Sequence, residues 1–374
     1  MIIKVLEKIS SLVAREAYEA NWVSPLSQRL SDFALSASRT WLSSIGRAAA
    51  IDELRAKIHA FGCFRNPDAW TQGIHFDIRN WAKCVEASHA QDPYTSMWLL
   101  EGWATRLVDC HLQTDFKFPW LSLSGAKTER LYASRLVLHT GAGMSFARFT
   151  LSQWTAAAAM PSLGAVIQEF LQIASERALP NYRACLVEPF GLVVRNLYPQ
   201  LIPAISRLLS ECSREEFDLF WHGSGRGLYF SPLHLVPGLP LRRWSFYEAT
   251  SNAPNPIALR NLISGFFWSV TLVNIRQPEV VTRFLGSRSM KDWEVVAQAI
   301  SDGVSAALLV WHHLTEDNRV TEHFLDHVPC PAPDALRRFW VDQIVSFSRL
   351  RLAHEYEHLR RDDRIADVFR YQEK

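Results

Sequence analysis

The stretch Ser-Arg-Glu-Glu-Phe-Asp-Leu-Phe-Trp-His-Gly-Ser-Gly-Arg-Gly-Leu-Tyr-Phe, residues 213–230, decides the fold. Ser213 followed by Glu216 is a capping box, so we expect a helix that begins at Arg214. Aromatic side chains then recur at helical spacing, which indicates one buried face of this helix. They are Phe217, Phe220 and Trp221.

Three glycines in close succession, Gly223, Gly225 and Gly227, follow within the same helical pattern. Each Gly costs a helix about 1 kcal/mol relative to Ala, so the cluster needs a physical reason. Without a side chain, the backbone can be approached closely by a neighbouring helix or a ligand, or it can leave the helix. Because apolar residues surround the cluster and turn residues do not, we expect close helix packing.

Residues 136–149 repeat this arrangement as Leu-Val-Leu-His-Thr-Gly-Ala-Gly-Met-Ser-Phe-Ala-Arg-Phe. His139 precedes two glycines there, as His222 precedes the glycines of the first stretch. Weaker copies occur around Gly102 and Gly265. The copies are unequally spaced, so they are not a short-period repeat array, and a degenerate duplication of a helical unit fits better.

Four short segments, in their order along the chain, resemble the UnbL-type proteins, an uncharacterised bacterial family encoded in enediyne and other polyketide gene clusters. The resemblance covers residues 90–285, and the family has no activity to carry over. It implies a soluble bacterial protein beside natural-product assembly, and the histidine-rich C-terminal end has no counterpart in it. The segments are Glu-Gly-Trp-Ala (101–104), His-Thr-Gly-Ala-Gly (139–143), Gly-Arg-Gly-Leu-Tyr-Phe (225–230) and Ser-Gly-Phe-Phe-Trp (264–268).

The composition allows a large buried core, since 48% of the 374 residues are hydrophobic and 21% are charged. A net charge of +2 gives no electrostatic basis for binding nucleic acid, and we expect none. The 14 Trp and 21 Phe residues suit a large apolar cavity, although dense helix packing uses such rings equally well. The six cysteines form no CxxC pair, which favours reduced thiols in a cytoplasm over a disulfide scaffold or a structural zinc site.

The N-terminal segment lacks the uninterrupted apolar region of a signal peptide, and no apolar run is long enough to predict a membrane span. Signals for β-strands are nearly absent, so we predict an all-α fold with glycine-marked, close-packed helices and a small hairpin near 228–248. We expect a single domain over 1–374, divisible into 1–90, 91–285 and 286–374. Helices are predicted at 1–60 (two), 93–112, 129–150, 163–178, 257–276, 293–311 and 334–361, with loops at 61–75 and 231–258.

Glu101 is the most informative acid, because Trp98 and Trp103 flank it in an apolar part of its helix. Desolvation there would raise the pKa of the carboxyl toward neutrality and suit an acid catalyst. If the glycine-bearing helices pack on one another, His139 and His222 would approach the same space and complete an acid–base set with Glu101. The alternatives are a buried glutamate paired with Arg106 or with an arginine on another helix, and histidines that only fix the packing.

Arg226 lies between two glycines, where a guanidinium can bind a carboxylate, a carboxamide or a phosphate. We expect it at the polar end of one internal cavity that otherwise has aromatic walls. Neither GxGxxG after a strand nor a P-loop is present, so no nucleotide or other cofactor is expected. The predicted wall residues are Trp98, Trp103, Phe146, Tyr229 and Trp268.

His354-Glu355-Tyr356-Glu357-His358 matches HExxH, in which two histidines on one helical face bind zinc and the glutamate acts as base. The surrounding helix is highly charged, and no third ligand stands at standard spacing. We therefore predict that this segment is not a metal site.

Three functions remain open from the sequence. The first is a tailoring enzyme of bacterial natural-product biosynthesis that cyclises or rearranges a polyketide- or terpenoid-like substrate, free or on a carrier protein. The second is a C-terminal metalloenzyme, a zinc hydrolase or an iron oxygenase. The third is a non-catalytic protein that binds or presents an intermediate. The sequence indicates no oligomeric state.

Overall fold

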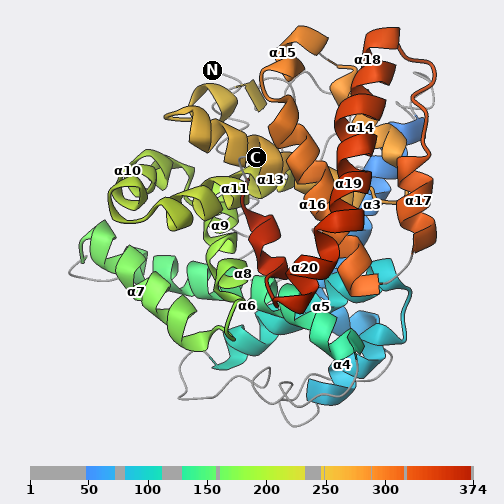
Figure 1. The fold of residues 1–374 in the computed structure, drawn as a ribbon. Helices are drawn as coiled ribbons and strands as arrows, with labels where there is room; N and C mark the ends of the chain where they lie inside the picture. The colour runs from blue at the N-terminus through green and yellow to red at the C-terminus, as the bar shows by residue number, and fades with distance from the viewer. Residues whose placement is uncertain are drawn as a thin grey trace.

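The structure of this protein is a computed structural model (Figure 1), and it describes eight parts of the chain. Within these parts every regular element is helical and there is no strand, which confirms the all-α prediction. The described residues are 48–71, 81–111, 129–156, 161–231, 246–247, 249–287, 289–315 and 318–371.

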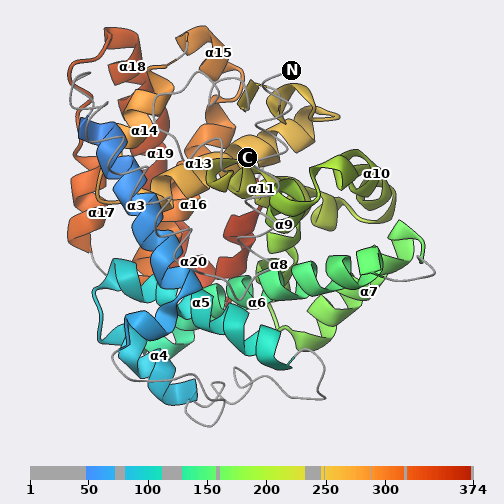
Figure 2. The ribbon, with the colours of Figure 1, turned by 180° about the vertical axis from the view of Figure 1, so that it is seen from behind.

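The main helices pack on one another in a series that closes on itself. Each helix contacts the next one in the series. In addition, α16 contacts α5 and α6, and α3 contacts α13. Figure 2 shows α3 lying across α5 on the side opposite α20. In chain order the series comprises α3 (Ala48–Arg65), α5 (Pro93–His111), α6 (Glu129–Ala156), α9 (Pro189–Leu197), α11 (Arg214–Phe230), α13 (Pro256–Val273) and α16 (Ala297–Thr315).

Shorter helices surround this series, with α7 and α10 at one side of Figure 1 and α17 and α18 at the other. Buried hydrophobic side chains from α3 to the 3-10 helix η7 (Ile365–Phe369) form one contiguous core. The shorter helices are α4 (Trp81–His89), α7 (Leu163–Arg177), α8 (Arg183–Val187), α10 (Ile202–Cys212), α14 (Pro278–Leu285), α15 (Met290–Glu294), α17 (Asn318–Leu325), α18 (Asp334–Phe339), α19 (Ser346–His354) and α20 (Tyr356–Arg361).

Helix α11 begins where the sequence predicts. The Ser213 side chain accepts a hydrogen bond from the backbone N–H of Glu216, and the helix starts at Arg214. It then continues through all three of its glycines to Phe230. The cluster therefore does not break the helix, and its purpose is found in the packing.

The glycines of α11 lie where neighbouring backbones touch the helix. A Cβ at Gly223 would stand 1.9 Å from the carbonyl oxygen of Glu188, just before α9. A Cβ at Gly225 would stand 2.0 Å from the carbonyl oxygen of Leu262 in α13. Two residues correspond to about 200° around a helix, so these glycines open opposite faces and α11 is held between two helices. The prediction of close-packed glycine contacts is confirmed.

The same two-sided contact occurs in α6. A Cβ at Gly141 would stand 2.1 Å from the carbonyl oxygen of Glu101 in α5. A Cβ at Gly143 would stand 2.4 Å from that of Leu186 in α8. In both places, therefore, the glycines of the repeated sequence pattern allow a helix to pack closely between two neighbouring backbones.

Two sequence predictions about element boundaries are wrong. The loop predicted at 61–75 begins too early, because α3 continues through Gly62 to Arg65 and buries Cys63 completely. The single helix predicted at 334–361 is divided by a π-helical segment, η6 (Trp340–Val345), and again at Glu355. A π turn holds more residues than an α turn, so the residues after it are rotated about the helix axis. In this orientation Arg351 of α19 lies buried against α16.

The hairpin predicted near 228–248 is not found among the described residues, since 228–230 end α11 and 246–247 are helical. Residues 1–47 and 232–245, which include one predicted helix and half of the predicted 231–258 loop, lie outside the described residues. The described part of that loop is partly helical, at 246–247 and 249–251, and α13 begins before the predicted loop ends. The predicted helix at 293–311 corresponds to α16 and the end of α15.

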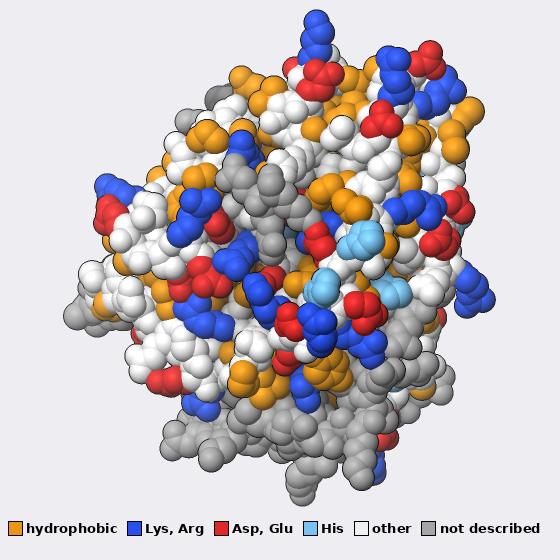
Figure 3. All heavy atoms as spheres, viewed as in Figure 1, with side chains coloured by type: hydrophobic (Ala, Val, Ile, Leu, Met, Phe, Trp, Pro, Cys, Tyr) orange, Lys and Arg blue, Asp and Glu red, His pale blue; other side chains and the backbone are white. Residues whose placement is uncertain are grey.

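One described helix, α13, is long and apolar enough to cross a membrane. In its 18-residue window, 78% of the residues are buried, and α11 and α16 pack against it. This is the environment of a core helix. The face in Figure 3 carries basic and acidic side chains close together rather than an extended patch of one sign.

Candidate functional site

Helix α11 presents two polar side chains to the centre of the helix series. His222 and Arg226 are four residues apart, so they lie one turn apart on the same face. Both side chains are buried, with exposed fractions of 0% for His222 and 1% for Arg226. Since the glycines between and beside them let α9 and α13 approach closely, these helices enclose both side chains.

The acid that holds them is Glu188, which the sequence analysis did not single out. Glu188 directly precedes α9 and is completely buried. Its Oε1 accepts a hydrogen bond from His222 Nδ1 at 2.8 Å, and its Oε2 accepts one from Arg226 Nη1 at 2.6 Å. A signal was present in the sequence, because Glu188 is the one charged residue between Arg183 and Arg195.

Glu101 of α5 approaches the second terminal nitrogen of the same guanidinium. Its Oε1 lies 3.5 Å from Arg226 Nη2, and 4% of the residue is exposed. Burial raises the pKa of Glu101 to about 7, the positive Arg226 opposes this rise, and the negative Glu188 adds to it. Both protonation states of Glu101 are therefore populated near neutral pH. Glu101 is thus both a desolvated acid and the partner of an arginine on another helix, whereas Arg106 pairs with Asp68.

Arg226 is enclosed by rings as well as by acids. The guanidinium carbon lies 4.5 Å from the ring centre of Trp268 and 5.8 Å from that of Phe369. Its Nε has no hydrogen-bond partner among the described residues. One permanent positive charge thus serves two carboxyl groups, and since Glu188 holds it at the shorter distance, Glu101 is the carboxyl left with the weaker ion pair.

A small cavity of about 30 Å³ opens beside Glu101 and Arg226. These two residues supply its polar surface, while its other lining residues are apolar and come from α3, α5, α6, α9 and α11. The half-buried rings of Phe61 and Phe230 meet edge to face, 5.4 Å between centroids. The other apolar lining residues are Ala60, Phe64, Trp98, Met144 and Leu192.

The cavity differs from the large aromatic chamber predicted from the sequence. A volume of 30 Å³ holds about two water molecules, because one water needs roughly 10–15 Å³ on this measure. Trp98 lines the cavity as predicted, whereas Trp103 and Phe146 are buried in the core and Trp268 lies against Arg226. The rings fill the space between helices, and their number in the sequence therefore measures packing rather than cavity size.

Tyr229, the remaining predicted wall residue, belongs to a second buried polar cluster. Its hydroxyl donates to Glu53 Oε1 at 3.2 Å and accepts from Asn274 Nδ2 at 2.8 Å. Lys57 Nζ lies 3.7 Å from the centre of its ring and 3.3 Å from Glu53 Oε1. These contacts join α3, α11 and α13 and give Tyr229 a role in packing.

His139 hydrogen-bonds to backbone groups of other residues, contrary to the expectation of one acid–base set with Glu101 and His222. Its Nδ1 donates to the carbonyl oxygen of Arg135 at 2.6 Å, and its Nε2 accepts from the backbone N–H of Leu179 at 3.1 Å. Burial lowers the pKa of His139 to about 4, so the ring is neutral at physiological pH. His139 is a packing histidine that ties α6 to the end of α7.

A register difference of one residue explains the separation. Gly141 of α6 lies against Glu101 of α5, and Gly223 of α11 lies against Glu188, just before α9. His139 lies two residues before its glycine, but His222 lies one residue before its own. One residue is about 100° of helix rotation, so the two imidazoles point to different neighbours.

The HExxH segment is not built as a metal site. His354 and His358 are exposed, α19 ends at His354, and Glu355 accepts a hydrogen bond from Arg351 Nε at 2.7 Å. Within the parts of the chain that the structure describes, no group of three His, Cys, Asp or Glu side chains could hold a metal ion.

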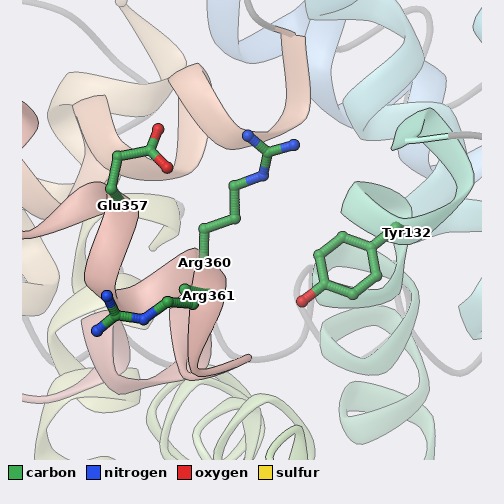
Figure 4. A pocket seen from close by; sticks show the side chains of 4 residues that line it. All are labelled: Tyr132, Glu357, Arg360 and Arg361. Atoms are coloured by element: carbon green, nitrogen blue, oxygen red, sulfur yellow. The ribbon is translucent and has the colours of Figure 1, made fainter.

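A groove of about 400 Å³ lies beside α20 and faces Tyr132 of α6 (Figure 4). Its lining also includes Glu357, Arg360 and Arg361, and Arg361 points away from Tyr132. The Tyr132 hydroxyl donates to Asp363 Oδ1 at 2.5 Å, and burial together with this acid raises the pKa of Tyr132 to about 12. This phenol therefore stays neutral at physiological pH, and Glu101 is the stronger candidate for proton transfer.

No protein-family model matches this chain, and neither a curated protein nor a solved structure is significantly similar to it.

Proposed function

We propose that the protein is a proton-transfer enzyme that acts on an apolar molecule, with Glu101 as the catalytic acid or base. One observation carries the proposal: the Glu101 carboxyl reaches a cavity whose lining is apolar apart from Glu101 and Arg226, and burial raises its pKa to about 7. A group with a pKa near the working pH serves both proton donation and proton removal. Perturbed acids in clefts occur preferentially at functional sites.

The other polar residues of the site act on Glu101 rather than on substrate. Arg226 holds its Oε1 and limits how far burial can raise its pKa. Glu188 fixes Arg226, and His222 fixes the second oxygen of Glu188. Arg226, Glu188 and His222 are therefore positioning residues in this proposal, and Glu101 is the group that exchanges a proton.

The size of the cavity limits what can bind without movement. About 30 Å³ accommodates the reacting group of a substrate but not a long chain. Phe61 and Phe230 are half-buried lining rings that meet edge to face, so their rotation is the simplest way to admit the rest of an apolar molecule. The proposed substrate is thus an apolar molecule with one small polar reacting group.

The resemblance to the UnbL-type family supports a biological setting. We propose that the reaction is a cyclisation or rearrangement in bacterial natural-product assembly and that it occurs in the cytoplasm. A polyketide- or terpenoid-like intermediate, free or on a carrier protein, meets the requirement for an apolar substrate. Proton gain or loss at one carbon or oxygen atom is a common trigger for such rearrangements.

Gene deletion followed by an isotope experiment tests the proposal. A strain without the gene should accumulate the substrate, which is then purified and incubated with the protein in D₂O. Mass spectrometry should detect deuterium incorporation with wild-type protein and none with Glu101→Gln, which keeps the size of the side chain. Glu355→Gln is the matched control, because this acid lies outside the site and should leave incorporation unchanged.

Equal deuterium incorporation by wild type and Glu101→Gln would refute the assignment of Glu101. If the accumulated compound binds without exchanging any proton, the protein is instead a binding protein for that intermediate. The metalloenzyme alternative predicts that a chelator abolishes turnover, and the acid–base proposal predicts that it does not.

A further inference from the structure

We infer that the site recognises an uncharged carbonyl group on an apolar chain, whose oxygen lies between the Glu101 carboxyl and Arg226 Nη2. The inference rests on the proposed function, because it names the substrate class of the same site. It follows from three features of the cavity: the kind of polar groups, their charge and the surrounding surface.

The polar groups of the cavity can both donate a hydrogen bond to a single atom. Arg226 Nη2 is a donor only, and its contact with Glu101 Oε1 at 3.5 Å is long for a hydrogen bond. Glu101 is also a donor when it is protonated. An oxygen acceptor placed between them would therefore gain two hydrogen bonds, whereas an ammonium group would be repelled by the guanidinium.

The charge of the site favours a neutral acceptor over a carboxylate. Glu188 already compensates Arg226 through its 2.6 Å contact with Nη1. A ligand carboxylate would add a second negative charge to an enclosed region with one guanidinium, and desolvating it would not be repaid by a free cation. A ketone, aldehyde or ester oxygen requires no additional charge.

The remaining surface of the cavity accepts only an apolar body. The residues that α3, α6 and α9 contribute to the lining are hydrophobic and bring no charged group. The charged and titratable groups that face Glu101 are Arg226 from α11 and, behind it, Glu188 before α9 with its partner His222. The chain that carries the carbonyl would pass between Phe61 and Phe230.

Protonation of Glu101 should control this binding. Below pH 7 the carboxyl donates to the carbonyl oxygen, and above pH 7 it becomes an acceptor that repels the oxygen. The affinity for a ketone should then fall about tenfold for each pH unit above the Glu101 pKa, since each bound ketone requires one proton on that group. Two donors on one oxygen also polarise the carbonyl bond, as in an oxyanion hole.

The test uses full-length wild-type protein and four probes with the same chain: 2-decanone carrying ¹³C at the carbonyl, decanoate, decylamine and decane. NMR titrations at pH 6, 7 and 8.5 measure affinity and the carbonyl shift. We expect 2-decanone to bind best, its carbonyl carbon to move downfield, and its affinity to fall at least tenfold between pH 7 and 8.5. The wild-type pH series requires no variant to fold.

Two variants examine the donor directly. Glu101→Gln keeps an N–H donor, so it should bind 2-decanone without a pH dependence above pH 7. Glu101→Leu removes the donor and should weaken binding at least tenfold. Tighter binding of decanoate than of 2-decanone, no binding of 2-decanone at millimolar concentration, or a pH-independent wild-type affinity would overturn the inference.

The outcomes separate this inference from the proposed function. Ketone binding with the expected pH dependence, but no deuterium exchange with the accumulated compound, would support the recognition of a carbonyl and refute catalysis. Deuterium exchange that requires Glu101, in a protein that prefers decanoate, would support catalysis and refute the carbonyl assignment.

Discussion

Replacing Gly225 by Ala should destabilise the fold through the contact between α11 and α13. A Cβ at this position would stand 2.0 Å from the carbonyl oxygen of Leu262 and 2.8 Å from the backbone nitrogen of Phe266. Both atoms belong to a helix backbone, which cannot rotate away as a side chain can. Restoring an ordinary separation of 3.4 Å requires the helices to move apart by roughly 1.4 Å, the difference between 3.4 and 2.0 Å.

The expected cost combines two effects of opposite sign. Overpacking of a close contact costs typically about 1–3 kcal/mol, and more where the backbone must shift. Ala gains back about 1 kcal/mol over Gly in helix propensity. The contact is reciprocal, because a Cβ added at Gly265 of α13 would stand 1.9 Å from the carbonyl oxygen of His222 in α11. The two helices must therefore separate along their whole contact. We therefore expect a net loss of about 2 kcal/mol, and a larger loss for Gly225→Leu.

Gly62→Ala is the matched control, since an added Cβ at Gly62 has no atom within 4 Å. Both glycines lie inside helices, so the gain in helix propensity is common to both and only the clash differs. Equilibrium denaturation should show Gly62→Ala slightly stabilised, by up to about 1 kcal/mol. Equal effects of the two substitutions would refute the packing account of the glycine cluster.

Three other changes have expected outcomes that follow from the charges. Glu188→Gln should lower the Glu101 pKa from about 7 toward 4.5, because Arg226 loses its compensating charge; infrared spectroscopy of the protonated carboxyl measures this shift. Arg351→Met should cost about 3–5 kcal/mol by removing the guanidinium that compensates the buried Asp302 carboxylate, whereas Arg349→Met, at a 46% exposed side chain, should cost less than about 1 kcal/mol in the same denaturation assay. Between pH 4.5 and about 7, Glu101 keeps a proton in the folded protein that it has lost in the unfolded chain. The free energy of unfolding should therefore fall as the pH rises through this window, by up to about 1.4 kcal/mol per pH unit. Glu101→Gln should remove this contribution from the pH dependence of unfolding.

The local structure was largely predictable where one short-range signal determined it. The capping box at Ser213 predicted the start of α11, and the apolar surroundings of its glycines predicted helix contacts rather than turns. The desolvation of Glu101 was predictable for the same reason, because its neighbours in the helix are apolar. Its pairing with Arg226 was kept only as pairing with some arginine, since the partner lies 125 positions away in the chain.

The rest of the site depends on long-range geometry that periodicity does not contain. Glu188 precedes a proline, which is typical of a helix start, and nothing near it in sequence marks it as the partner of α11. The separation of His139 from His222 depends on a rotation of one residue relative to the glycines. The size of the cavity depends on how the aromatic rings pack together. The number of rings in the sequence is compatible with either a filled or an empty interior.

The glycine contacts position the carboxyl groups of the acid–base network. The carbonyl oxygen of Glu188 lies where a Cβ of Gly223 would be, so the close approach that glycine permits also brings the Glu188 carboxylate to α11. A glutamate has a short side chain, and it reaches His222 and Arg226 only because the two backbones touch. The carbonyl of Glu101 likewise lies against Gly141, which sets the position of α5 and hence of the acid that faces Arg226. The glycines thus determine where both carboxyl groups lie, and burial beside a guanidinium that Glu188 holds more closely raises the pKa of Glu101 toward neutrality.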